Sequence, residues 1–321
     1  MNEIEYEINI NLTCHGLEVL QKGILSLVPF HRNFDFQYEG HKIQIAVDQG
    51  TNHDSQRMIR LSVNDSITIK KLWACFHHVD KLLMVLEGYF YEIETISFQG
   101  DTDTGSEYTG ISQELLKRRL PCYKTDSAYR YKDHSFVDLE RGFTKEMLSS
   151  WITLERELDI VHQIVLYSTA NTGITRDVKC AYLIECFEPI TEIVNAYDFF
   201  FPSLRPGDRN TTLKMCIDAV ISKYGKDVFE KEYACNKERF LQTLVNSRNR
   251  IMHIKRNQPA GKYLSGTESV LYAVKLMHLY RIVLLSLMGV HYDDYSRAVV
   301  ESIKEWNQWQ GVLDSFLQSM N

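Results

Sequence analysis

The sequence lacks the motifs by which many catalytic and cofactor-binding folds are recognised. It contains no P-loop, no GxGxxG and no GxSxG, so nothing indicates a phosphate cradle, a dinucleotide fold or a nucleophile elbow. Its seven cysteines are odd in number and form no CxxC pair. This spacing argues against both a disulfide framework and a zinc site. We therefore expect neither a metal nor a cofactor.

Targeting signals and membrane spans are also missing. The N-terminus, MNEIEYEINI, is acidic and lacks the basic-then-apolar order of a signal peptide. The longest apolar run, near residues 282–290, is too short to cross a bilayer. These features predict a cytoplasmic protein that does not bind membranes.

Basic residues are outnumbered by acidic residues overall, but they are concentrated in one stretch. The formal net charge is −6; residues 1–143 carry this excess, whereas residues 144–321 are neutral. Within residues 237–262, seven basic side chains accompany a single acidic one, Glu238. The whole molecule is therefore no general polyanion binder, and this stretch is where phosphate groups would be attracted.

The first 140 residues have mostly the alternating pattern of β strands. Strands are predicted at residues 6–11, 41–47, 58–63 and 91–98, with one helix at 67–88. The polar stretch 98–110 is expected to be a loop, and 117–142 has no clear period. We predict a β-rich, sandwich-like domain with one helix over residues 1–140.

Residues 141–321 have helical spacing and short connections. Helices are expected over 144–169, 175–197, 211–225, 236–254, 266–289 and 295–320. Such a series predicts an antiparallel helical bundle. The chain as a whole is therefore predicted to be α+β, with a domain boundary near residues 135–145.

The most informative stretch is VNSRNRIMHIKRN, residues 245–257. Four Arg-Asn pairs occur in the chain, and only that at Arg248 has a histidine, His253, five residues beyond the arginine. On a helix Asn249 and His253 share one face, and the long Arg248 side chain could swing toward them. We expect the buried side of this helix to include Val245, Ile251 and Met252. The alternative is the solvated face of an ordinary helix.

The stretch from SRNRIMHIKRN to the leucine-rich helix ending in MGV resembles the HEPN superfamily, and within it the ApeA-like HEPN domains. The resemblance covers roughly residues 145–318, and a β-rich domain before such a bundle is similar to the layout of ApeA-type defence proteins. It implies a HEPN helical bundle that cleaves RNA without a metal, with Arg248, Asn249 and His253 catalytic at a dimer interface. The implied product carries a 2′,3′-cyclic phosphate.

The residue types suit this chemistry independently of the resemblance. RNA carries its own nucleophile, the 2′-OH, so the protein must move protons and stabilise charge on the phosphate. A histidine ordinarily titrates at about pH 6.5 and can act as general base or acid. Arg248 can bind phosphate oxygens bidentately, and Asn249 can orient the imidazole or donate to the phosphate. Because one histidine cannot easily serve both sides of phosphorus, we predict a twofold dimer through the helix that carries Arg248 and His253.

Other residues are candidates for supporting roles. Four basic side chains are candidates for binding the RNA backbone: Arg250, Lys255, Arg256 and Lys262. Glu185 could hold Arg248 in place or tune His253, or it could be an ordinary surface carboxylate. Tyr263 and Tyr272 could stack bases, although most tyrosines serve packing.

Two functions follow from these features. The first is an endoribonuclease that acts as a prokaryotic antiviral or toxin effector, whose acidic N-terminal domain recognises a trigger or partner. The second is a non-catalytic HEPN module for dimerisation or for binding a nucleotide or partner. The presence of both Arg248 and His253 favours the enzyme.

Overall fold

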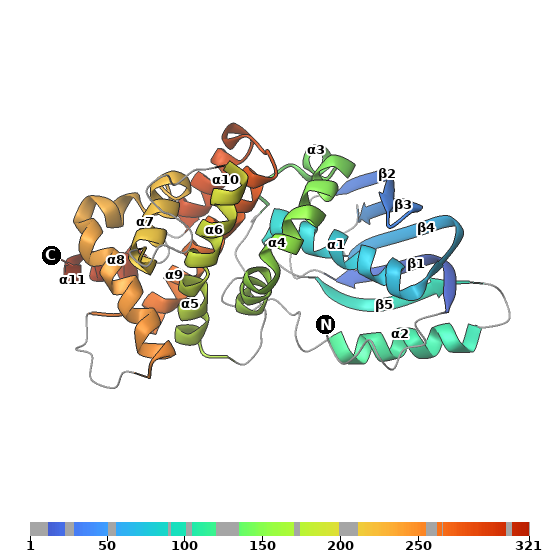
Figure 1. Cartoon of the computed structure of the whole chain (residues 1–321), viewed down its shortest axis with the longest axis horizontal. Helices are drawn as coiled ribbons and strands as arrows, with labels where there is room; N and C mark the ends of the chain where they lie inside the picture. Colours follow the sequence, from blue (N-terminus) through green and yellow to red (C-terminus); the bar gives the residue numbers. More distant parts are fainter. Residues whose placement is uncertain are drawn as a thin grey trace. The chain divides into compact units, whose positions relative to one another are not determined.

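The chain was analysed as a computed structural model that describes residues 12–22, 29–50, 56–88, 91–100, 105–119, 135–169, 174–198, 211–254, 262–264, 266–305 and 310–320. It divides into two compact units. The first is formed by residues 1–125 and 137–152, and the second by residues 126–136 and 153–321. Strands lie in the first unit, and the second is helical (Figure 1).

The first unit is built on one antiparallel sheet, with the strand order β2-β3-β4-β1-β5 (Figure 1). Its strands are β1 (Thr13–Lys22), β2 (Phe30–Tyr38), β3 (His41–Gln49), β4 (Gln56–Thr68) and β5 (Glu92–Gln99). Alternate residues of β3 and β4 are buried, among them Ile43, Ile45, Ile59 and Leu61. The sheet therefore has one face in the core, as is common for antiparallel sheets.

Helix α1 (Ile69–Glu87) packs against β1 and β4. It begins at Thr68, whose hydroxyl caps the helix, and ends at Gly88 with a left-handed φ of 84°. Its apolar stripe is wholly buried, comprising Leu72, Phe76, Val79, Leu83 and Leu86. The helix predicted over residues 67–88 is thus confirmed, because the apolar spacing, the cap and the stop signal agree.

The predicted α+β class is confirmed, but the first unit differs in detail from the expectation. Among the described residues it has a single sheet covered by α1 and not two stacked sheets. It also has a second long helix, α2 (Gly105–Arg119), which packs against β5, and a short α3 (Leu139–Gly142). The loop expected over residues 98–110 is therefore helical from Gly105 onward. The strand predicted at residues 6–11 lies outside the described residues.

Helix α4 (Lys145–Thr169) belongs to the first unit up to Ile152 and to the second unit from Thr153 onward. The helices that lie wholly in the second unit are α5 (Arg176–Glu185), α6 (Phe187–Asp198), α7 (Leu213–Tyr224), α8 (Glu230–Met252), α9 (Thr267–Leu287), α10 (Tyr292–Glu305) and α11 (Gln310–Met320). The single helix expected over 175–197 is interrupted at Cys186, and the one expected over 295–320 is described as α10 and α11. The helical character predicted for this part of the chain is confirmed.

Helix α9 forms the centre of the second unit, since every residue from Ser269 to Leu285 is buried. Among the described residues it is the one helix long and apolar enough to cross a membrane, but 89% of its most apolar window is buried inside the structure. This burial is typical of a core helix. The buried Lys275 on α9 pairs with Glu232 of α8, which also accepts a hydrogen bond from Tyr272 at 3.0 Å.

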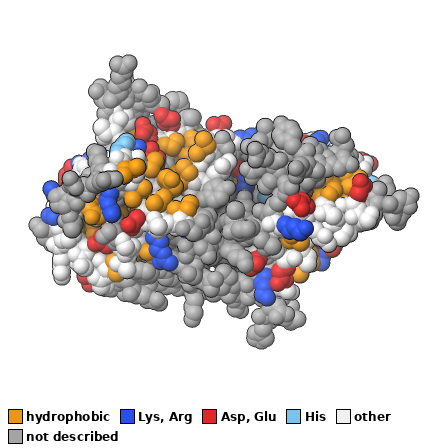
Figure 2. Space-filling view, turned by 90° about the horizontal axis from the view of Figure 1, so that it is seen from below, with side chains coloured by type: hydrophobic (Ala, Val, Ile, Leu, Met, Phe, Trp, Pro, Cys, Tyr) orange, Lys and Arg blue, Asp and Glu red, His pale blue; other side chains and the backbone are white. Residues whose placement is uncertain are grey.

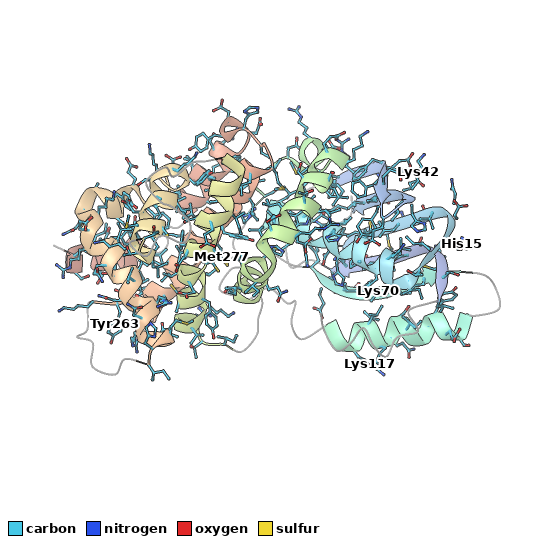
Figure 3. The ribbon with its side chains drawn as sticks, in the orientation of Figure 1. His15, Lys42, Lys70, Lys117, Tyr263 and Met277 are labelled. Carbon is cyan, nitrogen blue, oxygen red and sulfur yellow. The ribbon has the colours of Figure 1, made fainter. Side chains whose placement is uncertain are left out.

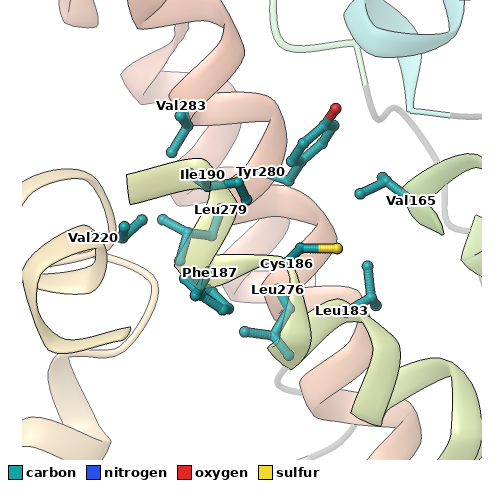
Figure 4. A pocket seen from close by; sticks show the side chains of 10 residues that line it. All are labelled: Val165, Leu183, Cys186, Phe187, Ile190, Val220, Leu276, Leu279, Tyr280 and Val283. Atoms are coloured by element: carbon teal, nitrogen blue, oxygen red, sulfur yellow. The ribbon is translucent and has the colours of Figure 1, made fainter. Parts of the chain in front are cut away.

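A small void lies in the core of the second unit (Figure 4). It measures about 10 Å³ and is lined by Val165, Leu183, Cys186, Phe187, Ile190, Val220, Leu276, Leu279, Tyr280 and Val283. This volume is roughly that of one water molecule. The void is therefore a packing gap and too small for a substrate or cofactor.

Candidate active site

Helix α8 carries residues 245–252 of the motif. Its backbone leaves the helical conformation at Asn236, whose side-chain Oδ1 accepts a hydrogen bond from the Arg239 N–H at 3.1 Å. The straight part of α8 thus starts at the residue from which the sequence predicted the helix to begin. The side chains of α8 that are buried in this part are Phe240, Leu241, Thr243, Leu244 and Ser247.

The expected composition of the buried side of α8 was wrong in part. Val245 and Ile251 are only half-buried, and Met252 is 39% exposed. Phe240, Leu244 and Ser247 follow one another at helical spacing and define the core-facing stripe. Ile251 continues this spacing near the end of the helix, whereas Val245 and Met252 lie on the flank of the stripe. The motif therefore lies closer to solvent than the sequence suggested.

Helix α8 ends at His253, whose backbone N–H still donates to the carbonyl of Asn249 at 3.1 Å. The next residue, Ile254, has a left-handed φ of 49° and is 77% exposed. A β-branched residue rarely adopts this conformation. The imidazole of His253 is thus presented on an exposed helix end. Over the second unit, Figure 2 shows hydrophobic side chains gathered on one face, with Lys and Arg among them.

The three motif residues form one hydrogen-bonded cluster. The Nη1 of Arg248 lies 2.9 Å from Asn249 Oδ1 and 3.0 Å from His253 Nε2. Arg248 stands about 100° from Asn249 around the helix, so its side chain bends across to reach both partners. The structure therefore brings together Arg248, Asn249 and His253.

Glu185 holds the other side of the guanidinium. Its carboxylate accepts from Arg248 Nη2 at 2.7 Å and also from Nε. Helix α5 ends at Glu185 because Pro189, four residues later, has no N–H to donate to the Glu185 carbonyl. Of the alternatives open for Glu185, the structure shows the one in which it holds Arg248.

These contacts constrain the hydrogen bonding of the cluster. Hydrogen bonding to Glu185 raises the pKa of Arg248, so the guanidinium stays charged. Arginine can only donate, and His253 Nε2 therefore accepts through its lone pair in this contact. The lone pair that could take a proton from a substrate is occupied by Arg248 in this arrangement.

The basic residues expected to bind the RNA backbone have different surroundings. Arg250 is half-buried, with its Nη1 3.9 Å from the Asp177 carboxylate on α5. Lys262 is exposed. Lys255 and Arg256 lie outside the described residues.

The two tyrosines differ sharply. Tyr272 is 0% exposed and hydrogen-bonded to Glu232, so the suggestion that it stacks bases was wrong. It belongs to the fully buried helix α9, where packing decides its place. Tyr263 is half-buried and lies beside the carboxyl end of α8 (Figure 3).

Metal ligands do not cluster in the part of the chain that the structure describes. There, no group of three or more His, Cys, Asp or Glu side chains could hold a metal ion. The six described cysteines are free thiols.

The motif lies in a segment that matches a known protein family. Residues 195–294 match the model of the Apea-like HEPN domain. The chain contains an Apea-like HEPN domain. Membership indicates a nuclease or RNA-related function in general terms. No curated protein and no solved structure matches the chain.

The HEPN match and the geometry concern the same residues. Arg248, Asn249 and His253 all fall within the matched segment, whereas Glu185 precedes it. Sequence reasoning named Glu185 only as one possibility, because its contact with Arg248 joins two helices that are far apart in the sequence.

Proposed function

We propose that this protein is a metal-independent endoribonuclease whose active site is shared between two copies of its HEPN domain. The observation that carries the proposal is the contact of Arg248 Nη1 with both Asn249 and His253, at 2.9 and 3.0 Å, on an exposed helix end. A charged guanidinium next to an imidazole suits the cleavage of a phosphodiester that has a neighbouring hydroxyl.

The proposed reaction is an internal transesterification. Once Arg248 turns from His253 Nε2 to the phosphate, His253 of one copy accepts the proton of the ribose 2′-OH while the O2′–P bond forms. The P–O5′ bond breaks, and the leaving O5′ takes a proton from the histidine of the second copy, which enters this step in its protonated form. Arg248 and Asn249 stabilise the charge on the non-bridging oxygens. The products are a 2′,3′-cyclic phosphate and a 5′-OH, with no metal taking part.

A second copy of the chain is needed because one imidazole cannot act on both sides of phosphorus. The exposed apolar residues at the helix end support this face as the contact: Met252 is 39% and Ile254 77% exposed, and Ile254 also has a strained φ. A protein of this kind would act as an antiviral or toxin effector. The first unit would then recognise its trigger or partner.

The central test is cleavage of total tRNA and mRNA by the full chain in the presence of EDTA. We expect 2′,3′-cyclic phosphate ends, and a fall of about 10²- to 10⁴-fold for His253→Ala. The control is His291→Ala, another exposed histidine of the second unit. If His253→Ala cleaves as well as the control, the non-catalytic HEPN module becomes the better description.

The shared site is tested by the oligomeric state. Ile254→Asp is expected to give a monomer in sedimentation experiments and to abolish cleavage. Its control, Ile160→Asp, changes another isoleucine of the second unit that is 66% exposed, and it should remain dimeric and active. An active Ile254→Asp monomer would exclude a site shared across this face.

A further inference from the structure

The segment Lys262–Leu264 is fastened along α8 beside the cluster. The Nδ2 of Asn246 donates to the Lys262 carbonyl at 3.0 Å, and the Leu264 N–H donates to Ser247 Oγ at 2.7 Å. Leu264 is 2% exposed, so it anchors the segment in the core. Tyr263, between these two anchors, therefore has a defined position on α8.

Tyr263 is stacked against a guanidinium. The Cζ of Arg250 lies 4.2 Å from the centre of the Tyr263 ring. Arg250 is in turn directed toward Asp177, whose carboxylate accepts from the Gly266 N–H at 3.1 Å. Both the ring and the guanidinium plane are thus held by neighbours on α5 and on the returning chain, and the pair is preorganised.

The stacked pair lies on the same side of α8 as the catalytic candidates. Residues at 100° per position place Asn246, Asn249, Arg250 and His253 within about 100° of one another. Neighbours three or four positions apart are separated by roughly 5–6 Å. Arg250 directly follows Asn249 and lies three positions, about one helical turn, before His253.

Arg248 and Arg250 lie on opposite flanks of the side of α8 that carries Asn249 and His253. Arg248 is held by Glu185, and Arg250 is directed toward Asp177, both on α5. A phosphate placed at Arg248 and His253 leaves the adjoining nucleotide within reach of Arg250 and Tyr263. Aromatic rings and guanidinium planes are the groups on which unpaired nucleobases stack.

We propose that Tyr263, backed by Arg250, is a nucleobase subsite that receives the base next to the scissile phosphate. This inference rests on the proposed function for the position of that phosphate. It names the substrate class as RNA with an unpaired, unstacked base at the cleaved bond, since a base within a duplex cannot stack on a side chain. Tyr263 is then a positioning residue and takes no part in proton transfer.

The first arm of the test removes the nucleobase from the RNA and, separately, the tyrosine ring from the protein. After the cleaved bond of a short single-stranded RNA has been mapped, substrates with one abasic residue on either side of it are compared with intact RNA. Tyr263→Leu should lower kcat/KM on intact RNA roughly 10- to 100-fold, the loss expected for one stacked base. On the RNA that is abasic at the contacted position it should have little effect, and Tyr263→Phe should behave as wild type.

A control separates stacking from a general loss of structure. Tyr292→Leu changes a tyrosine of the same unit that is 46% exposed, and its kcat/KM should equal that of wild type on both substrates. If Tyr263→Leu is impaired equally on intact and abasic RNA, the tyrosine only packs the segment 262–264 and the inference is overturned.

The second arm does not depend on cleavage. RNA with 2-aminopurine beside the bond is bound to His253→Ala protein, and stacking on Tyr263 should quench its fluorescence. Introducing Tyr263→Leu as a second substitution into the His253→Ala protein should restore the fluorescence. Quenching that persists in the double variant overturns the inference. If wild type binds and quenches this RNA without cleaving any RNA, the proposed function fails and the subsite stands. If it binds no RNA, both fail.

Discussion

Two arginine–glutamate pairs in this molecule have the same chemistry and opposite surroundings. In the first unit, Arg57 and Glu87 have side chains 1% and 3% exposed, and their closest atoms are 2.5 Å apart. Gln49 accepts two further hydrogen bonds from Arg57, whose guanidinium lies 3.9 Å over the Tyr91 ring. In the second unit, Arg248 and Glu185 are 20% and 32% exposed.

The difference in exposure separates a structural pair from the pair that is proposed to act in RNA cleavage. No ligand can reach Arg57, and removing one member of such a sealed pair leaves a buried charge. Water partly screens the pair of Arg248 and Glu185, so its contribution to folding is small. However, Arg248 also contacts His253 at the surface. Damage to the first pair should therefore appear in stability, and damage to the second in RNA cleavage.

The largest effect on stability is expected for the buried pair of Arg57 and Glu87. Glu87→Ala should lower the free energy of unfolding by roughly 3–5 kcal/mol, because the Arg57 charge remains buried without its partner. Urea unfolding followed by circular dichroism measures this loss. The control is Asp35→Ala, which breaks a pair with Lys42 whose side chains are 52% and 59% exposed, and it should cost under about 1 kcal/mol. Equal losses of unfolding free energy in the two variants would mean that burial of an ion pair does not decide its contribution to stability.

The partly exposed pair of Arg248 and Glu185 is tested next with a substitution that keeps the positive charge. Arg248→Lys should change the free energy of unfolding by under about 1 kcal/mol. Its RNA cleavage should fall about 10²- to 10³-fold, because lysine cannot present the planar fork of donors. Arg297→Lys, at an arginine 90% exposed on α10, is the control and should retain full activity. A stability loss like that of Glu87→Ala, with cleavage intact, would make this pair structural too.

A smaller effect on RNA cleavage is expected when the Glu185 carboxylate is changed. Glu185→Gln keeps the shape but weakens the hold on Arg248, so kcat should fall about tenfold with little change in KM. Glu157→Gln, an exposed glutamate on α4, should leave both constants unchanged. A rise in KM with constant kcat would instead mean that Glu185 contributes to RNA binding. Faster cleavage by Glu185→Gln would mean that the carboxylate competes with the RNA phosphate for Arg248.

The sequence predicted those parts of the fold in which local signals agree. The α1 helix has a cap, an apolar stripe and a stop glycine, and was placed to within two residues. Strand β1 was missed because its register shifts between Cys14 and Gly16, which interrupts the two-residue alternation. Strand β2 has aromatic residues at Phe34, Phe36 and Tyr38, a signal that could have identified it.

The candidate site was foreseen only as far as one helix determines it. The four-residue spacing of Asn249 and His253 is a local property, and Arg248 follows in the same helix. The pair with Glu185 joins residues 63 positions apart, and no local pattern predicts such a contact. Likewise, Tyr263 and Tyr272 look alike as residues, and only the packing of α9 shows that Tyr272 is buried.

The smallest expected effect concerns a third, more exposed pair in the second unit. Burial raises the pKa of the Asp218 carboxyl, but hydrogen bonds from Lys237, Ser222 and Tyr233 outweigh burial and lower it. A lowered carboxyl pKa stabilises the fold above the ordinary value of about 3.9 and loses that contribution as the pH falls through the folded value.

Asp218→Asn should therefore lower the free energy of unfolding at pH 6 by under about 1 kcal/mol, because the side chain is 34% exposed. The gap between variant and wild type should narrow below about pH 4, as measured by urea unfolding at several pH values. Glu238→Gln removes one negative charge from the same α8 at a side chain 75% exposed, and should have a smaller effect at pH 6. A gap that widens in acid would contradict the lowered pKa, because a carboxylate stabilised by three donors must lose its advantage once it is protonated.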